Sequence, residues 1–214
     1  METNKPTSLS RRSAIGGMGA AMALPLVGPT ISPTAKPVEG KVALVTGSGR
    51  NLGRAAVLEL ARRGADVVVN ARSNREEAEA VAGEAEALGV RAIALLADVG
   101  NEQQVNQMVA EALGTFGRID ILINNAGGQF PATPTEISDR GWRAVIDLNL
   151  NGTWNMCSRM GPHMVKRGSG CIVNVVHVYS FERGSAPFVH SGAARAGVVN
   201  MTKSLAQYWA SHGV

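Results

Sequence analysis

The chain has 214 residues, of which 45% are hydrophobic, 18% charged and 4% aromatic. This length and apolar content fit one packed domain, and they exclude both a pair of ordinary domains and a disordered chain. The formal net charge is +4, of which Lys5, Arg11 and Arg12 against Glu2 supply +2. The remaining +2 is ordinary for a chain of this length, so we expect no nucleic-acid partner.

The first 35 residues have the pattern of an export signal. Residues 10–15 contain an arginine pair and resemble the twin-arginine motif, and a weakly apolar stretch at 15–27 follows. That stretch is too short and too rich in glycine to span a bilayer. We therefore expect a signal or disordered segment at 1–35, a folded domain at 36–214, and a mature periplasmic protein with no membrane partner. A mis-assigned start would instead leave the protein in the cytoplasm.

Strand-like and helix-like segments alternate after residue 40. Runs of near-continuous apolar character, expected of parallel strands buried on both faces, lie at 42–46, 67–70, 92–96, 119–123 and 171–177. Apolar residues at helical spacing lie at 52–63, 75–88, 102–116, 139–166 and 191–212. The pattern predicts an α/β fold with a doubly wound, Rossmann-type parallel sheet in three α/β/α layers. A fifth strand would leave an apolar edge exposed, so we expect the last strands of the sheet to be missing.

A glycine-rich turn joins the first predicted strand to the first predicted helix. Glycines at such a turn let the backbone approach a pyrophosphate, which then lies at the N-terminus of the helix. The residues of the turn are Gly47, Ser48, Gly49, Arg50, Asn51, Leu52 and Gly53. The sequence therefore predicts a dinucleotide site here.

Together with Thr46, this turn resembles the TGxxxGxG motif of the short-chain dehydrogenase/reductase family. Asn51 stands where the family usually has its middle glycine, and Asn tolerates a positive φ better than other non-glycine residues. The resemblance continues to the end of the chain, through an adenine-bracketing segment at 97–99 and an Asn-Asn-Ala-Gly element at 124–127. It implies further cofactor contacts from Asp98, Val99, Asn125, Ala126 and Gly127.

The end of the second predicted strand indicates which dinucleotide is bound. An acidic residue there would accept hydrogen bonds from a ribose 2′-hydroxyl and repel a 2′-phosphate. Ala71 holds this position, Arg72 and Ser73 follow it, and Arg50 faces the same corner from the glycine turn. Two guanidinium groups without a carboxylate favour a phosphorylated ribose, so we expect NADP(H).

The catalytic residues depart from the family's pattern, which is Ser, then Tyr thirteen residues later, then Lys four residues beyond. Aligning the chain on residues 196–206 fills the three positions with Val178, Ser191 and Arg195. Aligning it on residues 172–174, with one residue of slack in the loop, fills them with His177, His190 and Ala194. Neither alignment supplies a Tyr or a Lys.

Tyr179 resembles the tyrosine of the 2,4-dienoyl-CoA reductase branch, and residues 188–198 resemble trans-2-enoyl-CoA reductases. Reduction of a C=C bond conjugated to a thioester needs a donor to the enolate oxygen, whereas a ketone requires proton transfer to oxygen. Arg195 stays protonated and cannot relay a proton. We therefore expect an NADP(H)-dependent oxidoreductase with an enoyl thioester as leading substrate. The alternatives are a ketone or alcohol dehydrogenase and a truncated nucleotide-binding protein without turnover.

The resemblance adds a helix asparagine to the candidate catalytic set, which is Asn149, His177, Tyr179, His190, Ser191 and Arg195. Each has a structural alternative: His190 or Ser191 could cap the last helix, and Arg195 could lie on the surface. The two cysteines, Cys157 and Cys171, are expected to be buried free thiols, and no metal site is predicted. The helices at 139–166 and 191–212 match those that pair in family oligomers, so we expect a homo-oligomer.

Overall fold

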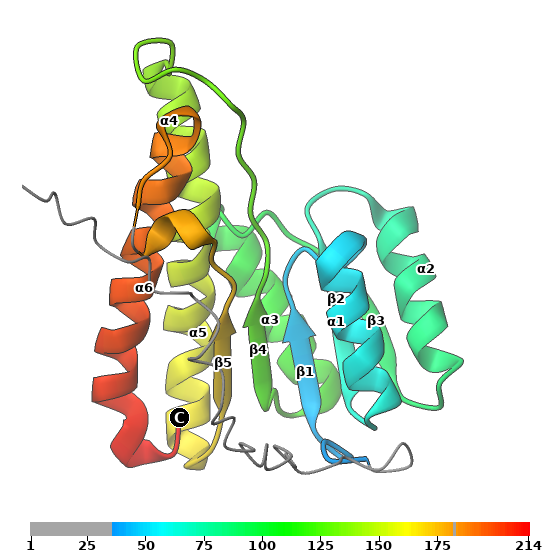
Figure 1. Cartoon of the computed structure of the whole chain (residues 1–214). Coiled ribbons are helices and arrows are strands. Elements are labelled where there is room, and N and C mark those ends of the chain that lie inside the picture. The colour runs from blue at the N-terminus through cyan, green and yellow to red at the C-terminus, as the bar shows by residue number, and fades with distance from the viewer. Residues whose placement is uncertain (1–35, 182) are drawn as a thin grey trace, which may run out of the picture. The chain divides into compact units, whose positions relative to one another are not determined.

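Runs of β-branched and aliphatic residues form five parallel strands of one sheet (Figure 1). The computed structural model describes residues 36–181 and 183–214, and the predicted signal at 1–35 lies outside them. The strands are β1 (Val42–Val45), β2 (Asp66–Ala71), β3 (Ala92–Leu96), β4 (Ile121–Asn124) and β5 (Cys171–Asn174). Their order is β3-β2-β1-β4-β5, so β1 pairs with β2 on one side and with β4 on the other. The direction of winding reverses at β1 and β4, and open α/β sheets bind ligands at such a point.

Helices join the strands and cover both faces of the sheet. They are α1 (Asn51–Arg62), α2 (Arg75–Glu86), α3 (Glu102–Phe116), α4 (Asp139–Ile146), α5 (Gly152–Arg167) and α6 (Val189–Trp209). Three have side-chain caps: Asn74, Asn101 and Ser138 accept from Glu77 N (3.2 Å), Gln104 N (3.1 Å) and Gly141 N (3.1 Å).

Two apolar cores lie on opposite faces of the sheet. Neighbouring residues of a strand point to opposite faces, so Val45 of β1 joins a core with Val57 of α1 and Val81 of α2. Leu44 joins the other core, with Met108 of α3 and with Met156, Met160 and Met164 of α5. These are the three layers of a doubly wound α/β fold, which confirms the fold class.

Several boundaries differ from the prediction. The segment at 139–166 is divided by the π-helix η1 (Asp147–Asn151), and β5 ends three residues before His177. Helix α6 begins at Val189 and its N-cap is Phe188, so neither His190 nor Ser191 caps it. Short 3-10 turns precede and follow α6: η2 (Val178–Ser180), η3 (Ala186–Phe188) and η4 (Ala210–His212).

The two cysteines differ in burial. Cys157 of α5 is buried, and burial raises the pKa of its thiol to about 11. Cys171 is exposed, which corrects the expectation that both thiols are buried. It lies on β5, which in the described part of the chain is the last strand of the sheet and pairs with β4.

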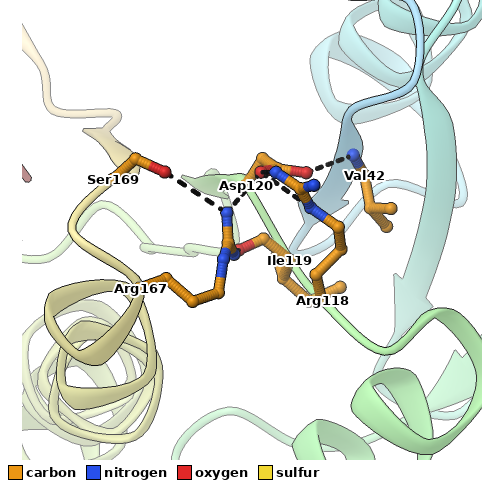
Figure 2. A network of polar contacts seen from close by, with 6 residues as sticks. All are labelled: Val42, Arg118, Ile119, Asp120, Arg167 and Ser169. Atoms are coloured by element: carbon orange, nitrogen blue, oxygen red, sulfur yellow. Dashed lines mark hydrogen bonds and ion pairs between the residues drawn. The ribbon is translucent and has the colours of Figure 1, made fainter.

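A charged network ties the amino ends of β1 and β4 to the end of α5 (Figure 2). The Asp120 carboxylate accepts from Val42 N (2.9 Å), Arg118 Nε (3.1 Å) and Arg167 Nη2 (2.5 Å). Arg167 Nη1 also donates to Ile119 O (2.8 Å). Burial alone would raise the pKa of Asp120, but the hydrogen bonds from Arg118, Val42 and Arg167 outweigh it, so the pKa is lowered.

Two classes of feature are absent from the part of the chain that the structure describes. No helix there is both long enough and apolar enough to cross a bilayer. No group of three or more His, Cys, Asp or Glu side chains gathers there as metal ligands would.

Candidate functional site

A cleft of about 590 Å³ lies at the carboxyl ends of β1, β2, β3 and β4. Thirteen of the fourteen predicted cofactor residues line it: Gly47, Gly49, Arg50, Asn51, Leu52, Gly53, Arg72, Ser73, Asp98, Val99, Asn125, Ala126 and Gly127. The fourteenth, Ser48, is buried below the cleft. Lining residues that the sequence analysis missed are Asn70, Ala71, Asn74, Glu77, Ala97, Gly128 and Leu148. Asn70, Ala71, Ala97 and Gly128 flank predicted residues at the strand ends, and this proximity could have indicated them. Asn74 and Glu77 at the start of α2 and Leu148 of η1 come from other elements, so strand-end spacing could not indicate them.

The glycine turn depends on two left-handed residues. Gly47 has a φ of +62°, and Asn51 has a φ of +51°, the only positive φ of a non-glycine residue in the described ranges. Asparagine adopts this conformation more readily than other residues with a side chain. The asparagine therefore meets the backbone requirement that a glycine meets in the family's motif.

This conformation leads to a stability prediction. Replacing Asn51 with Val is expected to lower the free energy of unfolding by about 1 kcal/mol, because a β-branched residue is strained in the left-handed region. Asn51→Gly is the matched control and should be at least as stable as the wild type. Urea denaturation of both variants tests this, and equal stability of Asn51→Val and wild type would contradict it.

Gly53 lets α1 approach the glycine turn closely. A Cβ at Gly53 would lie 2.6 Å from Asn125 Nδ2, 2.8 Å from Ser48 Cα and closer still to Gly47 O. The N-cap of α1, Arg50, makes no side-chain cap hydrogen bond among the described residues. The first-turn N–H groups of α1 thus stay available to an anion at a helix N-terminus.

Hydrogen bonds hold the turn rigidly on the strands. Thr46 Oγ1 accepts from Asn125 N and Ala126 N, both at 3.0 Å. Asn125 Nδ2 donates to Thr46 O (2.9 Å) and Gly47 O (3.1 Å). From β2, Asn70 Oδ1 accepts from Gly47 N (3.1 Å). The Asn-Asn-Ala-Gly element therefore shapes the cleft from below.

The far end of the cleft carries charge. Arg50, Arg72 and Ser73 are exposed there, and neither arginine forms an ion pair with a carboxylate in the described part. Glu77 of α2 also lines this end. Asp98 is fixed by its own loop, since its Oδ1 accepts from Gly100 N (2.9 Å).

Arg195 and Asn149 meet beneath the other end of the cleft. Arg195 Nη2 donates to Ala126 O (3.0 Å), while Asn149 Nδ2 donates to Gly128 O (2.7 Å) and Val145 O (2.8 Å). Both residues are buried, so the alternative of Arg195 on the surface is wrong. Arg195 Nη1 is buried without a partner among the described residues, and burial lowers the pKa of its guanidinium.

His177 and Ser191 form a direct pair. His177 Nε2 lies 2.9 Å from Ser191 Oγ, and His177 Nδ1 lies 3.3 Å from Ser180 Oγ. Burial, with a smaller contribution from the charge of Arg195, lowers the pKa of His177. The structure thus brings together the His177 of one sequence alignment and the Ser191 and Arg195 of the other.

The two remaining candidates lie beside this pair. The Tyr179 ring is 5.3 Å from the ring of His177 and stacks on Phe188 at 6.1 Å. His190 is fully buried, contacts Phe130 edge-on at 4.6 Å, and has no hydrogen-bond partner for either ring nitrogen among the described residues. None of the six catalytic candidates lines the cleft itself. Arg195 and Asn149 reach it through the carbonyl groups of Ala126 and Gly128.

Comparisons with known proteins agree with this architecture. The profile of the short chain dehydrogenase family matches residues 41–214. A 3-oxoacyl-(acyl-carrier-protein) reductase from Staphylococcus epidermidis is 37% identical over 176 residues, which are 81% of this chain and 71% of that relative. A subunit of (2S)-((R)-hydroxy(phenyl)methyl)succinyl-CoA dehydrogenase from Thauera aromatica is 37% identical over 170 residues, 79% of this chain and 67% of that relative. The structure of an NAD+-bound xylitol dehydrogenase is similar with a TM-score of 0.79 and 29% identity, covering 83% of this chain and 68% of that one.

Proposed function

The chain belongs to the short-chain dehydrogenase/reductase family of oxidoreductases that use a nicotinamide cofactor, and from this we propose that it uses NADP(H) to interconvert a ketone and an alcohol. One observation carries the proposal. Ala126 lines the cleft over the uncapped N-terminus of α1 and accepts a hydrogen bond from Arg195, whose charge acts on His177 of the His177–Ser191 pair.

The residues of the cleft fit a dinucleotide. Gly53 leaves room for α1 to press against the turn, and the N–H groups of that turn of helix can hold a pyrophosphate. Asp98 and Val99 line the cleft where the resemblance implies an adenine. Arg195, at the other end, lies beneath the cleft and holds the carbonyl group of Ala126 in its wall. The bound nicotinamide supplies or accepts the hydride.

Charge at the far end of the cleft supports NADP(H) over NAD(H). Arg50 and Arg72 are exposed at this end without ion-pair partners among the described residues, whereas Asp98, one of the two lining carboxylates beside Glu77, already accepts a hydrogen bond from Gly100 N. A 2′-phosphate gains charge-assisted hydrogen bonds from guanidinium groups. The xylitol dehydrogenase relative is NAD+-bound, so the family alone does not decide the choice.

Removal of the two arginines should therefore abolish the preference for NADPH. Arg72→Ala and Arg50→Ala are each expected to weaken NADPH binding about tenfold, near 1.4 kcal/mol, and to leave NADH binding almost unchanged. Glu77→Gln is the opposite-sign control and should tighten NADPH binding. Fluorescence titration with both cofactors tests this, and equal wild-type affinities for NADPH and NADH would contradict it.

Substrate chemistry follows from the relatives and from the site. Both named relatives act on acyl thioesters that carry oxygen at the β-carbon, one as a 3-oxoacyl reductase and one as a dehydrogenase of a hydroxyacyl-CoA. A ketone must gain a proton on oxygen when it is reduced, and the His177–Ser191 pair can exchange one. We therefore propose a 3-oxoacyl or 3-hydroxyacyl thioester as the leading substrate. The comparisons do not support the enoyl thioester that we expected from the sequence.

An assay with matched substrates tests this order. The full chain with NADPH is expected to reduce a 3-oxoacyl-CoA at least tenfold faster than the 2-enoyl-CoA of the same length. A faster rate with the enoyl substrate would restore the first expectation. Tight NADPH binding without turnover of any substrate would instead favour a nucleotide-binding protein.

A further inference from the structure

The candidate catalytic residues differ in whether a substrate can reach them. Asn149, His190, Ser191 and Arg195 are buried, with 2%, 0%, 1% and 6% of their surface exposed. His177 and Tyr179 are only half-buried. A group that exchanges a proton with a substrate oxygen must come within hydrogen-bond distance of it. Among the six candidates, these two side chains meet that condition.

A ring from a second element occupies the place beside Ser191. In the alignment on residues 196–206, Ser191 stands at the family's Tyr position, but a serine hydroxyl lies several ångström nearer the backbone than a tyrosine hydroxyl. The His177 imidazole, from the segment between β5 and η2, lies against that short side chain with Nε2 2.9 Å from Ser191 Oγ. Ser180 contacts the opposite nitrogen, so hydroxyl groups on both sides fix the plane of the ring.

We propose that His177 is the catalytic acid–base residue, and that Ser191 and Ser180 are the positioning residues that orient its ring. This inference rests on the proposed ketone–alcohol chemistry and assigns its proton. In the oxidation direction, the substrate hydroxyl gives its proton to Nδ1 of the neutral imidazole. A bound oxidised nicotinamide would accept the hydride from the same carbon as the C=O bond forms. In the reduction direction, the imidazolium returns the proton to the carbonyl oxygen.

The two hydrogen bonds of the ring differ in a way that suits this role. The contact of Nε2 with Ser191, at 2.9 Å, is the shorter, and Ser191 is fixed within the first turn of α6. The contact of Nδ1 with Ser180, at 3.3 Å, is the longer and weaker one. A substrate oxygen can therefore replace Ser180 at Nδ1 while Ser191 keeps the ring in place.

Neighbouring charge sets the pH range in which the imidazole works. The charged and titratable groups that the structure places beside His177 are Arg195 of α6 and Tyr179 of η2. Because burial and Arg195 lower the pKa of His177, the neutral base dominates at pH 7. Oxidation should therefore reach a plateau above that pKa and fall below it, whereas reduction should fall as the pH rises through it.

The test compares His177→Gln with His212→Gln in the full chain. Glutamine can still hydrogen-bond Ser191 but does not titrate, and His212 is an exposed histidine of η4. His177→Gln is expected to lower kcat by about 100-fold or more, to remove the pH-dependent limb, and to leave NADPH affinity unchanged. His212→Gln should match the wild type. Unchanged NADPH affinity shows that the variant is folded.

The positioning residue has its own readout. Ser191→Ala should lower kcat about tenfold with little change in KM, and Ser191→Thr, which keeps a hydroxyl, should restore it. Two results would overturn the inference alone: an active wild type whose rate and pH profile survive in His177→Gln, or loss of activity in Tyr179→Phe but not in His177→Gln. A wild type that binds NADPH and reduces no ketone would overturn the proposed function, and this inference with it.

Discussion

Replacing Gly53 with alanine is expected to weaken cofactor binding by about 100-fold, or about 2.8 kcal/mol. The added Cβ would lie 2.6 Å from Asn125 Nδ2, 2.8 Å from Ser48 Cα and closer still to Gly47 O. Two of these three atoms belong to the backbone of the turn, and Asn125 Nδ2 is held by hydrogen bonds to Thr46 O and Gly47 O. These neighbouring atoms therefore cannot shift easily to accommodate the Cβ. The turn itself must move away from the pyrophosphate position.

Gly83→Ala is the matched control for this prediction. Gly83 is an exposed residue within α2, and a Cβ there would meet nothing within 4 Å. This variant should bind NADPH as the wild type does and gain up to about 1 kcal/mol of stability from the better helix former. Fluorescence titration of NADPH provides the comparison. Wild-type affinity in Gly53→Ala would show that the close approach of α1 is not required.

Removal of the Asp120 carboxylate is expected to produce the largest loss of stability. Asp120→Ala leaves Val42 N without its acceptor and deprives Arg118 and Arg167 of their shared anion. Charge-assisted hydrogen bonds of this kind support an estimate of about 2 kcal/mol, because the two arginines remain partly solvated. Chemical denaturation measures the change. Glu79→Ala, which breaks an exposed ion pair with Arg75, is the control and should change the stability by less than about 0.5 kcal/mol.

The Asp120 contribution should also depend on pH. Because the pKa of Asp120 is lower in the folded state than in the unfolded state, its stabilisation is fully present above the unfolded value, which is about 3.9. It is lost as the pH falls through the folded value. The difference in unfolding free energy between wild type and Asp120→Asn should therefore shrink on acidification below about pH 4. A difference that stayed constant from pH 7 to pH 3 would contradict this.

The sequence predicts the layers of this fold well because parallel strands buried on both faces have a continuous apolar pattern. All four residues of β1 are buried, and its neighbour β2 is buried from Val67 to Ala71. The π-helix at Asp147–Asn151 was missed because one wide turn leaves no distinct apolar period. Cys171 was misjudged for a related reason: the apolar run around it is typical of a strand, but its burial depends on what lies beside the edge of the sheet.

The cofactor cleft was more predictable than the catalytic group. The turn between β1 and α1 is local, so its spacing alone indicates which residues face the cleft. The pairing of His177 with Ser191 depends instead on the fold of the segment between β5 and α6. Each of the two alignments named one member of the pair: His177 comes from the alignment on residues 172–174 and Ser191 from the alignment on residues 196–206. The two alignments differ by one residue in the loop between β5 and α6, so sequence spacing cannot show which side chains of the two elements meet.

The wide turn at Asp147–Asn151 joins α4 to α5 and lets the two sides of the joint serve different roles. Upstream of Gly152, the amide of Asn149 reaches Gly128 O; downstream, Met156, Met160 and Met164 point into the apolar layer. Deleting Leu150 or Asn151, which follow Asn149 in the turn, would rotate everything after it by about 100° relative to α4. The methionines would then leave their layer while Asn149 stayed in place. The length of the π-helical turn thus sets how α5 is rotated relative to α4. We therefore expect this length to tolerate less change than the residue composition of the turn.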